Sequence, residues 1–201
     1  MTHATMDPTR HATMHATPTT VYDTMPSPVG ELTLVADDAG LTGVYFEQHR
    51  HGRRADPAWR RAAEWPGAAA TVLAETRRQL EEYLDGRRDR FTLPLAARGT
   101  PFQQRVWAAL LDIAPGATIS YGELARRVGS PAAVRAVGGA NARNPLSIVV
   151  PCHRVVGADG ALTGFGGGVE RKRWLLAHER AAGEGAAPMP VPPARRAASA
   201  R

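Results

Sequence analysis

The stretch NPLSIVVPCHRVVG, residues 144–157, contains the only cysteine of this chain of 201 residues. Cys152 stands between a proline and His153, directly after the apolar run at 148–150, which predicts a buried strand with the thiol at its end. A thiol reacts as its thiolate, and with an ordinary pKa of about 8.5 it needs a nearby base or positive charge. Adjacent residues of a strand point to opposite faces, so His153 needs a water bridge or a sharp turn to act as that base.

The partner of this histidine must come from elsewhere in the chain. A histidine that acts as a base usually has an acceptor on its other ring nitrogen, and Glu179, at the end of LLAHE, is the favoured carboxylate. A lone cysteine is often a small buried core residue. The PCHR motif, the glycine-rich stretch after it and a pair of helices before it favour a nucleophile at Cys152 instead.

A helix-turn-helix is predicted upstream of this stretch. YGELARRVG and SPAAVRAVGGANARN are two short helical segments joined by VGSP. The second is expected to start with Ser130 as cap and Pro131 after it, and to carry Arg135 near its middle. Small residues, Ala136 and Gly138 among them, let this helix approach another surface closely. Short helix pairs are also common in ordinary cores, so the pattern alone leaves DNA binding and a structural role both open.

The remaining pattern divides the chain into a first block at 20–95 and a second block at 96–180. In the first block, TVYDTMPSPVGELTLVADDAGLTGVYFEQ predicts a small antiparallel sheet. GAAATVLAETRRQLEEYLDG predicts a helix that stops at Gly86, and RFTLPL predicts a further strand. Residues 59–67 are expected to form a loop. This block contains no set of residues typical of a catalytic or metal site, and it is interpreted as a scaffold domain.

The second block is predicted to be mostly helical. TPFQQRVWAALLDI begins with Thr100 as cap, then Pro101, with Gln103 completing a capping box. GADG is expected to be a tight turn, GFGGG a mobile glycine loop and VERKRWLLAHE a closing helix. The segments outside the two blocks, 1–19 and 181–201, lack hydrophobic periodicity or are rich in Ala and Pro, and are expected to be disordered tails.

The composition restricts the class of protein. The net charge is +6, and Lys172 is the only lysine among 25 basic residues. An arginine-rich surface suits nucleic-acid binding, although a GC-rich genome gives the same bias. A single cysteine excludes an internal disulfide and any zinc site with several thiolates. The polar N-terminus is not a secretory signal and no stretch is apolar enough to span a membrane, so a cytoplasmic protein is expected.

The motifs together resemble one known family. VPCHRVV is similar to the active-site signature of the O6-alkylguanine-DNA alkyltransferases, also called methylated-DNA–protein-cysteine methyltransferases. The segments GTPFQQRVWAAL, ISYGELARRVG, AVRAVGGANARNP, LTGFGGG and KRWLLAHE resemble the family's other segments in the same order, so the similarity covers residues 20–180. It implies an α/β (α+β) fold with an N-terminal ribonuclease-H-like domain that contains a small antiparallel sheet. The C-terminal domain is then mostly helical, winged helix-turn-helix-like, and carries the active-site cysteine.

The resemblance also implies an activity, which is DNA repair by direct reversal. An alkyl group passes from O6 of guanine, and also from O4 of thymine, to the cysteine in an irreversible, single-turnover reaction. The target base is flipped out of the duplex first. No cofactor and no metal are expected. The implied partner is double-stranded DNA containing O6-alkylguanine, with no membrane; a monomer is expected, and cooperative binding to DNA is left open.

The catalytic roles follow from the same resemblance, residue by residue. Cys152 is the nucleophile, His153 is its base through a water, and Glu179 orients the histidine. Asn144 holds the hinge between the second helix and the cysteine. Tyr121 turns the target phosphate and donates a hydrogen bond as charge leaves the guanine.

The contacts with DNA and with the flipped base are implied in the same way. Arg135 enters the base stack in place of the target, and its helix, with Ala136 and Gly138, docks in the minor groove. The pocket for the base is lined by Val155, Phe165, Gly166 and Gly167. Phe165 and Ser147 stand where some relatives have tyrosine and proline, which bears on the range of alkyl groups accepted.

Three other classes of protein are alternatives. A non-catalytic binder of alkylated bases has the same fold, but such relatives replace the cysteine, commonly with tryptophan. A Cys–His–Glu thiol hydrolase leaves the helix-turn-helix and Arg135 unexplained. A transcription factor with a structural cysteine leaves PCHRVV unexplained. The alkyltransferase is therefore the favoured interpretation.

Overall fold

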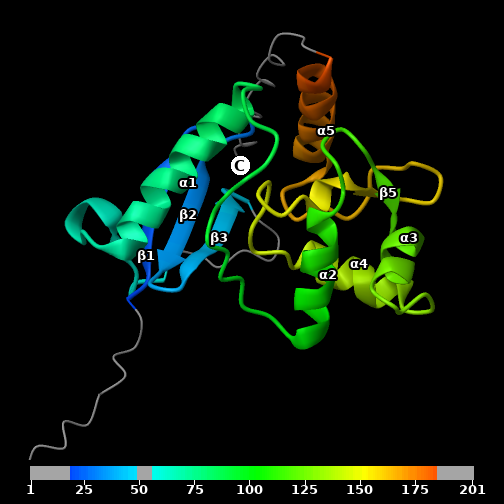
Figure 1. Cartoon of the computed structure of the whole chain (residues 1–201), viewed down its shortest axis with the longest axis horizontal. Helices are drawn as coiled ribbons and strands as arrows, with labels where there is room; N and C mark the ends of the chain where they lie inside the picture. Colours follow the sequence, from blue (N-terminus) through cyan, green and yellow to red (C-terminus); the bar gives the residue numbers. More distant parts are fainter. Residues whose placement is uncertain (1–18, 49–55, 185–201) are drawn as a thin grey trace, which may run out of the picture.

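The computed structural model describes residues 19–48 and 56–184. An N-terminal half built on a sheet packs beside a mostly helical C-terminal half (Figure 1). The strands are β1 (Val21–Met25), β2 (Leu32–Asp37), β3 (Gly40–Phe46) and β4 (Arg60–Arg61). They lie in the order β3-β2-β1-β4. β1 and β3 are antiparallel to β2, and the short β4 is parallel to β1. The predicted antiparallel sheet is thus confirmed.

Helix α1 (Ala68–Leu84) covers one face of this sheet (Figure 1). It ends before Gly86, whose φ of 74° is a conformation that favours glycine. Its buried side chains join those of the strands in a single core. The predicted helix and its end are confirmed. The stretch at 59–67, expected to be a loop, contains β4 and the short 3-10 helix η1 (Ala62–Glu64).

The predicted strand at RFTLPL is wrong. Only Leu95 forms a bridge there, to Leu41 of β3. The Leu41 N–H donates to the Pro94 carbonyl at 2.7 Å, and its carbonyl accepts from Ala96 at 2.8 Å. Because Pro94 has no N–H to donate, and because the chain is crossing from one half of the molecule to the other, the pairing does not extend into a ladder.

The same edge of β3 also holds the segment that precedes the cysteine. The Val44 N–H donates to the Pro145 carbonyl at 2.8 Å, and the Val44 carbonyl accepts from the Ser147 N–H at 3.3 Å. The N-terminal half therefore supports the active-site segment through backbone hydrogen bonds, which no local sequence pattern specifies.

The C-terminal half consists of short helices around a two-stranded parallel sheet. Its elements are α2 (Pro101–Leu111), β5 (Ile119–Ser120), α3 (Tyr121–Arg127), α4 (Val134–Ala142), η2 (Cys152–Arg154), β6 (Val155–Val156) and α5 (Val169–Gly183). The predicted capping box of α2 is present, since the backbone N–H groups of Thr100 and Gln103 each bond to the side chain of the other. α3 and α4 form the predicted helix pair, and α4 packs on α2, where Trp107 Nε1 donates to the Ala140 carbonyl at 2.9 Å.

Two local predictions in this half are wrong. α4 begins at Val134, because residues 130–133 form a turn that is closed by a backbone hydrogen bond of 2.9 Å. The run at 148–150 is buried, but it is not a strand. Ile148 has a left-handed φ of 72°, so the chain turns repeatedly before it reaches the cysteine.

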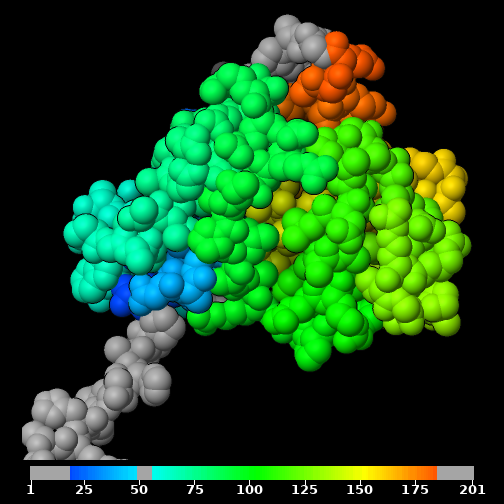
Figure 2. Space-filling model, in the orientation of Figure 1, coloured from blue at the N-terminus to red at the C-terminus, as the bar shows by residue number. Residues whose placement is uncertain are grey.

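The expected tails at 1–19 and 181–201 lie largely outside the described residues, so they and the domain limits stay predictions. Helix α5 continues to Gly183. Within the part of the chain that the structure describes, no helix is long and apolar enough to cross a membrane. In the space-filling view, the segment near residue 150, in yellow, is mostly covered by green residues of neighbouring segments (Figure 2). Cys152, in this segment, is buried.

Candidate active site

The thiol of Cys152 is held in a buried turn. Cys152 is 4% exposed and is the first residue of η2. Asn144 fixes the approach to it, because its Nδ2 donates to the Val150 carbonyl at 2.8 Å and its Oδ1 accepts from the Leu146 N–H at 3.0 Å. Asn141 of α4 donates from Nδ2 to the Cys152 carbonyl at 3.3 Å. Side-chain amides thus replace a strand ladder in this segment.

Ile148 is the strained residue of this turn. A left-handed φ is a genuine outlier for a β-branched side chain. Such a conformation costs about 1–3 kcal/mol and persists only where the surroundings over-determine it. Here the surroundings are the Asn144 bonds on one side and the edge of β3 on the other. The strain lies four residues from the thiol, so the active-site turn is a rigid, constrained part of the chain.

His153 and Glu179 come together behind the thiol. His153 Nε2 lies 2.8 Å from Glu179 Oε1, and both side chains are almost fully buried. Because Nε2 faces a carboxylate, it carries the proton, which leaves the lone pair of Nδ1 as an acceptor. Nδ1 is buried and has no hydrogen-bond partner among the described residues. The imidazole is therefore arranged as a base with a free acceptor atom.

Glu179 is more than a partner for the histidine. Arg154 donates to it from Nε to Oε2 at 3.0 Å and from Nη2 to Oε1 at 2.8 Å. Gly116 N–H donates to Oε2 at 3.0 Å, and Tyr83 Oη donates to Oε1 at 2.9 Å. Burial raises the pKa of Glu179, but the charges and hydrogen bonds of His153 and Arg154 outweigh burial and hold that pKa well below its usual range. The carboxylate is ionised and fully hydrogen-bonded.

The thiol and the imidazole are both neutral in this state. Burial raises the pKa of Cys152 to about 11, against the hydrogen bond from Asn144 and the charge of Lys172. Burial also lowers the pKa of His153, and this outweighs the attraction of Glu179. At neutral pH the proton therefore stays on the sulfur.

Lys172 and Tyr121 meet at the glycine-rich loop. The ammonium of Lys172, which is 0% exposed, donates to the Val155 carbonyl at 2.5 Å and to the Thr163 carbonyl at 2.8 Å. The Tyr121 hydroxyl donates to the same Thr163 carbonyl at 3.1 Å. Burial lowers the pKa of Lys172 to about 8, with the thiolate of Cys152 acting in the opposite direction. Two donors, one from α3 and one from α5, thus share one carbonyl of this loop.

The remaining predicted residues fall into two groups. Arg135 and Ala136 lie on the exposed side of α4, whereas Gly138 faces Tyr121, whose ring carbon would lie 3.8 Å from an added Cβ. The residues predicted for the base pocket, Val155, Phe165, Gly166 and Gly167, are buried. Phe165 presents its ring to that of His153 at 6.4 Å and 80°. The structure thus places Phe165 beside His153 and leaves Arg135 and Ala136 of α4 exposed.

Sequence reasoning missed four residues of the site: Tyr83, Asn141, Arg154 and Lys172. Arg154 is the arginine of the quoted PCHR motif, and Lys172 is the only lysine of the chain. Both facts were signals that a specific role was present. Tyr83 and Asn141 carry no such signal, because only the fold brings them to Glu179 and to Cys152.

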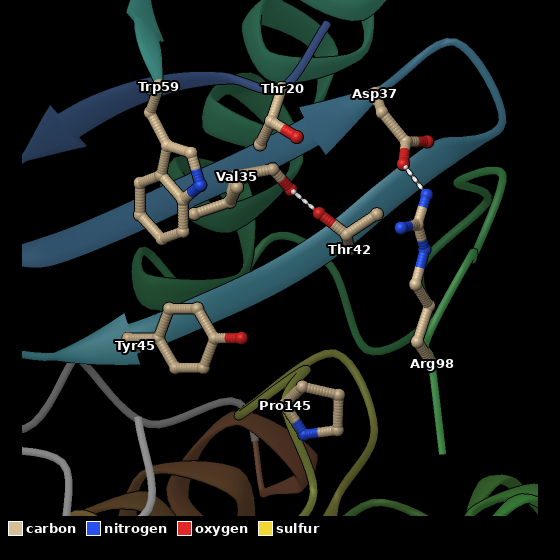
Figure 3. A pocket seen from close by; sticks show the side chains of 8 residues that line it. All are labelled: Thr20, Val35, Asp37, Thr42, Tyr45, Trp59, Arg98 and Pro145. Atoms are coloured by element: carbon tan, nitrogen blue, oxygen red, sulfur yellow. Dashed lines mark hydrogen bonds and ion pairs between the residues drawn. The ribbon is translucent and has the colours of Figure 1, made fainter. Parts of the chain in front are cut away.

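A cavity of about 100 Å³ lies elsewhere, on the outer face of the sheet (Figure 3). Its lining residues are Thr20, Val35, Asp37, Thr42, Tyr45, Trp59, Arg98 and Pro145. Arg98 Nη2 donates to the buried Asp37 at 2.5 Å. No catalytic candidate lines this cavity, so it is separate from the thiol. Among residues 19–48 and 56–184, no cluster of three or more His, Cys, Asp or Glu could hold a metal ion.

Comparison with known proteins defines the class first. The model of the 6-O-methylguanine DNA methyltransferase ribonuclease-like domain matches residues 20–97. The model of the DNA binding domain of the same proteins matches residues 101–181. The chain therefore has the two domains of a DNA-repair methyltransferase, in the order that the fold shows.

Individual relatives agree with this class. A methylated-DNA–protein-cysteine methyltransferase of Haemophilus influenzae is 44% identical over 160 residues, which cover 79% of this chain and 86% of that protein. The constitutive enzyme of Bacillus subtilis is 45% identical over 161 residues, covering 79% and 94%. The crystal structure of Mycobacterium tuberculosis OGT in complex with DNA matches with a TM-score of 0.72 and 45% identity, covering 81% and 94%.

The chain belongs to the 6-O-methylguanine DNA methyltransferase family. The predicted family and the mixed α/β fold are confirmed. The interpretation as a DNA-repair methyltransferase is confirmed as the favoured one over the thiol hydrolase and the transcription factor. The roles of the individual residues are not settled by these comparisons, and they are argued from the geometry below.

Proposed function

We propose that this protein, in the cytoplasm and without a cofactor, removes an alkyl group from O6 of guanine, and from O4 of thymine, in duplex DNA. The group is transferred to Cys152, once for each molecule. The observation that carries the proposal is the buried pair of His153 and Glu179 at 2.8 Å behind the single thiol. The exposed face of a helix-turn-helix in the same half of the chain provides the surface for DNA.

The first step is removal of the thiol proton. His153 Nδ1 has the free lone pair, and it takes the proton of Cys152 through a bridging water. Nε2–H remains bonded to Glu179, which stabilises the imidazolium that forms. Lys172 adds positive charge near the sulfur. The step becomes favourable only when the flipped base has entered, because in the free protein both groups are neutral.

The second step is a direct displacement. The thiolate of Cys152 attacks the alkyl carbon, so that the C–S bond forms while the bond between that carbon and O6 breaks. The electron pair stays on the guanine, which leaves as an anion stabilised by a hydrogen bond from the Tyr121 hydroxyl and takes up a proton from water, while the imidazolium of His153 returns its proton to water. The thioether cannot be hydrolysed, so the protein is consumed. Tyr121 must first give up its bond to the Thr163 carbonyl, which couples loop opening to base entry.

Base flipping follows from the burial of the thiol. A stacked guanine cannot bring its alkyl carbon to a side chain that is 4% exposed, so the base must leave the duplex at a cost of a few kcal/mol. Arg135 is exposed on α4 and fills the gap in the stack. The small residues Ala136 and Gly138 let the helix lie in the minor groove, where contacts need not depend on sequence. The protein acts as a monomer.

One assay tests this function. The protein is incubated with duplex DNA containing one O6-methylguanine, and its intact mass is then measured. A gain of one methyl on Cys152 that stops at one equivalent supports the proposal. Tight binding of the lesion without a change in mass points to a non-catalytic binder and overturns it. Repeated turnover of a thioester or amide substrate points to a hydrolase and overturns it as well.

A further inference from the structure

Tyr83 reaches the buried carboxylate from the N-terminal half, and no other described residue of that half has a hydrogen bond to it. It lies in the last turn of α1 and is 2% exposed. Its hydroxyl donates to Glu179 Oε1 at 2.9 Å, the same oxygen that receives His153 Nε2 at 2.8 Å. Its backbone carbonyl accepts from His178 Nε2 at 2.7 Å. Two hydrogen bonds therefore join the end of α1 to α5, and only one of them reaches the catalytic candidates.

The phenol is a donor throughout the accessible pH range. Burial and the neighbouring charge of Glu179 raise the pKa of Tyr83 well above its usual value, so the hydroxyl keeps its proton. The positive end of the O–H dipole points at Oε1, close to the imidazole bonded to the same atom. This dipole weakens the attraction of Glu179 for a protonated His153. The phenol and the arginine on the same carboxylate thus act in the same direction.

Other charged and polar groups face His153 and Cys152. His153 has Glu179 and Lys172 on α5 and Arg154 on η2. Cys152 has Lys172 on α5, the amide of Asn144 and the phenol of Tyr121 on α3. Removal of the Tyr83 hydroxyl changes no charge and leaves the residues proposed to contact the base in place. After its removal Glu179 keeps donors from His153, Arg154 and Gly116.

We propose that Tyr83 is a positioning residue for alkyl transfer: acting through Glu179, its hydroxyl holds the imidazole of His153 in the neutral form, whose Nδ1 is free to accept the thiol proton. This inference rests on the proposed function. It makes the N-terminal half a part of the machinery rather than a scaffold alone. A purely structural role for Tyr83, as filling between α1 and α5, would leave the proton affinity of His153 unchanged.

The test compares the wild-type protein with Tyr83→Phe, which removes only the hydroxyl. In full-length protein with 13C-labelled histidine, the imidazole resonance of His153 is followed by NMR over a range of pH and is assigned by its absence in His153→Gln. The midpoint of the His153 pH profile should move up by about 0.5–1 pH unit, which is the net value of one hydrogen bond expressed as a pKa shift. A ring-fluorinated tyrosine at position 83 is a stronger donor and should move the midpoint down.

The matched control is His178→Phe. It removes the other hydrogen bond between α1 and α5, and an aromatic ring can keep the stacking on Trp174 at 4.8 Å. Its profile should superimpose on that of the wild type. Coincident profiles for the wild type and Tyr83→Phe, a downward shift for Tyr83→Phe, or an equal shift in His178→Phe would overturn the role of Tyr83.

The outcome for Tyr83 is separable from the outcome for the proposed function. Wild-type protein that takes one methyl from O6-methylguanine DNA, together with a Tyr83→Phe profile that has not moved, overturns only the inference about Tyr83. Wild-type protein that takes no methyl overturns the proposed function, whatever the His153 titration profiles show. If Tyr83→Phe does not fold, the fluorinated variant decides the question, because it keeps the ring, and an unmoved midpoint then counts against the inference.

Discussion

Replacing Glu179 with glutamine should destabilise the protein strongly. The carboxylate receives hydrogen bonds from Tyr83, Gly116, His153 and Arg154. An amide keeps only one acceptor oxygen and places an NH₂ group against donors. The Arg154 guanidinium is 7% exposed and would keep only its bond to the Ile113 carbonyl. Breaking a buried ion pair in this way costs about 3–5 kcal/mol of the free energy of unfolding.

This loss is a large fraction of the total free energy of unfolding. A domain of ordinary stability has a free energy of unfolding of about 5–15 kcal/mol. For a protein of this size, each kcal/mol corresponds to about 2–4 °C in Tm, so Glu179→Gln should melt about 6–20 °C below the wild type. The control is Glu170→Gln, whose exposed carboxylate pairs with Arg173 on the same helix. It should change the free energy of unfolding by less than about 0.5 kcal/mol.

The dependence on pH gives a second check on the same carboxylate. The pKa of Glu179 is lower in the folded protein than its value of about 4.3 in an unfolded chain. Its contribution to stability is therefore complete above that unfolded value, and it is lost as the pH falls toward the folded pKa. The difference in free energy of unfolding between wild type and Glu179→Gln, from urea titrations, should be constant near neutral pH and shrink below about pH 4. A difference of less than about 1 kcal/mol at neutral pH would refute the argument, because desolvation would then cancel the pair.

Three further outcomes are expected. Gly40→Ala should lower the free energy of unfolding by about 2–4 kcal/mol in urea titrations, because φ is 135° there and the Cβ would lie 2.2 Å from a backbone carbonyl oxygen. Gly183→Ala, with open space around it, should be nearly neutral, and equal effects would contradict the steric argument. Because the pKa of Lys172 is about 8, its charge is present at neutral pH, so Lys172→Met should slow alkylation of Cys152 by iodoacetamide at pH 7; an unchanged rate would show that the charge is not felt. Arg135→Ala should slow methyl transfer from duplex DNA by about 10–100-fold and leave reaction with free benzylated guanine intact, whereas equal losses on both would exclude a role in filling the stack.

Local chemistry accounts for the elements that could be predicted from the sequence. The capping box of Thr100 and Gln103 forms because both partners lie within one helical turn. The end of α1 before Gly86 is equally local. The segments RFTLPL and 148–150 have the composition of strands. A strand, however, needs a neighbouring strand to pair with along its whole length. The only edge available to both is β3, and it bonds each of them over a short stretch.

The candidate site also has residues that the sequence predicted and partners that it did not. The thiol and the histidine are adjacent in sequence, and the resemblance to a known family supplied Glu179. The partners that set the proton affinities are not adjacent, because the Tyr83 hydroxyl reaches Glu179 across 96 positions of the chain and Lys172 reaches the Val155 carbonyl across 17. Only the packed fold fixes such contacts. The electrostatic state of the thiol was therefore outside the reach of any local pattern.

A dormant thiol is consistent with a protein that acts once. Any alkylating agent that reaches Cys152 in the free protein consumes the molecule without repairing DNA. Burial to 4% exposure excludes large reagents, and the raised pKa of about 11 keeps the reactive thiolate rare near neutral pH. The lowered pKa of His153 stops the base from taking the proton early. The same burial that protects the thiol also makes base flipping necessary, so the cost of unstacking the base limits reaction to bases that leave the duplex.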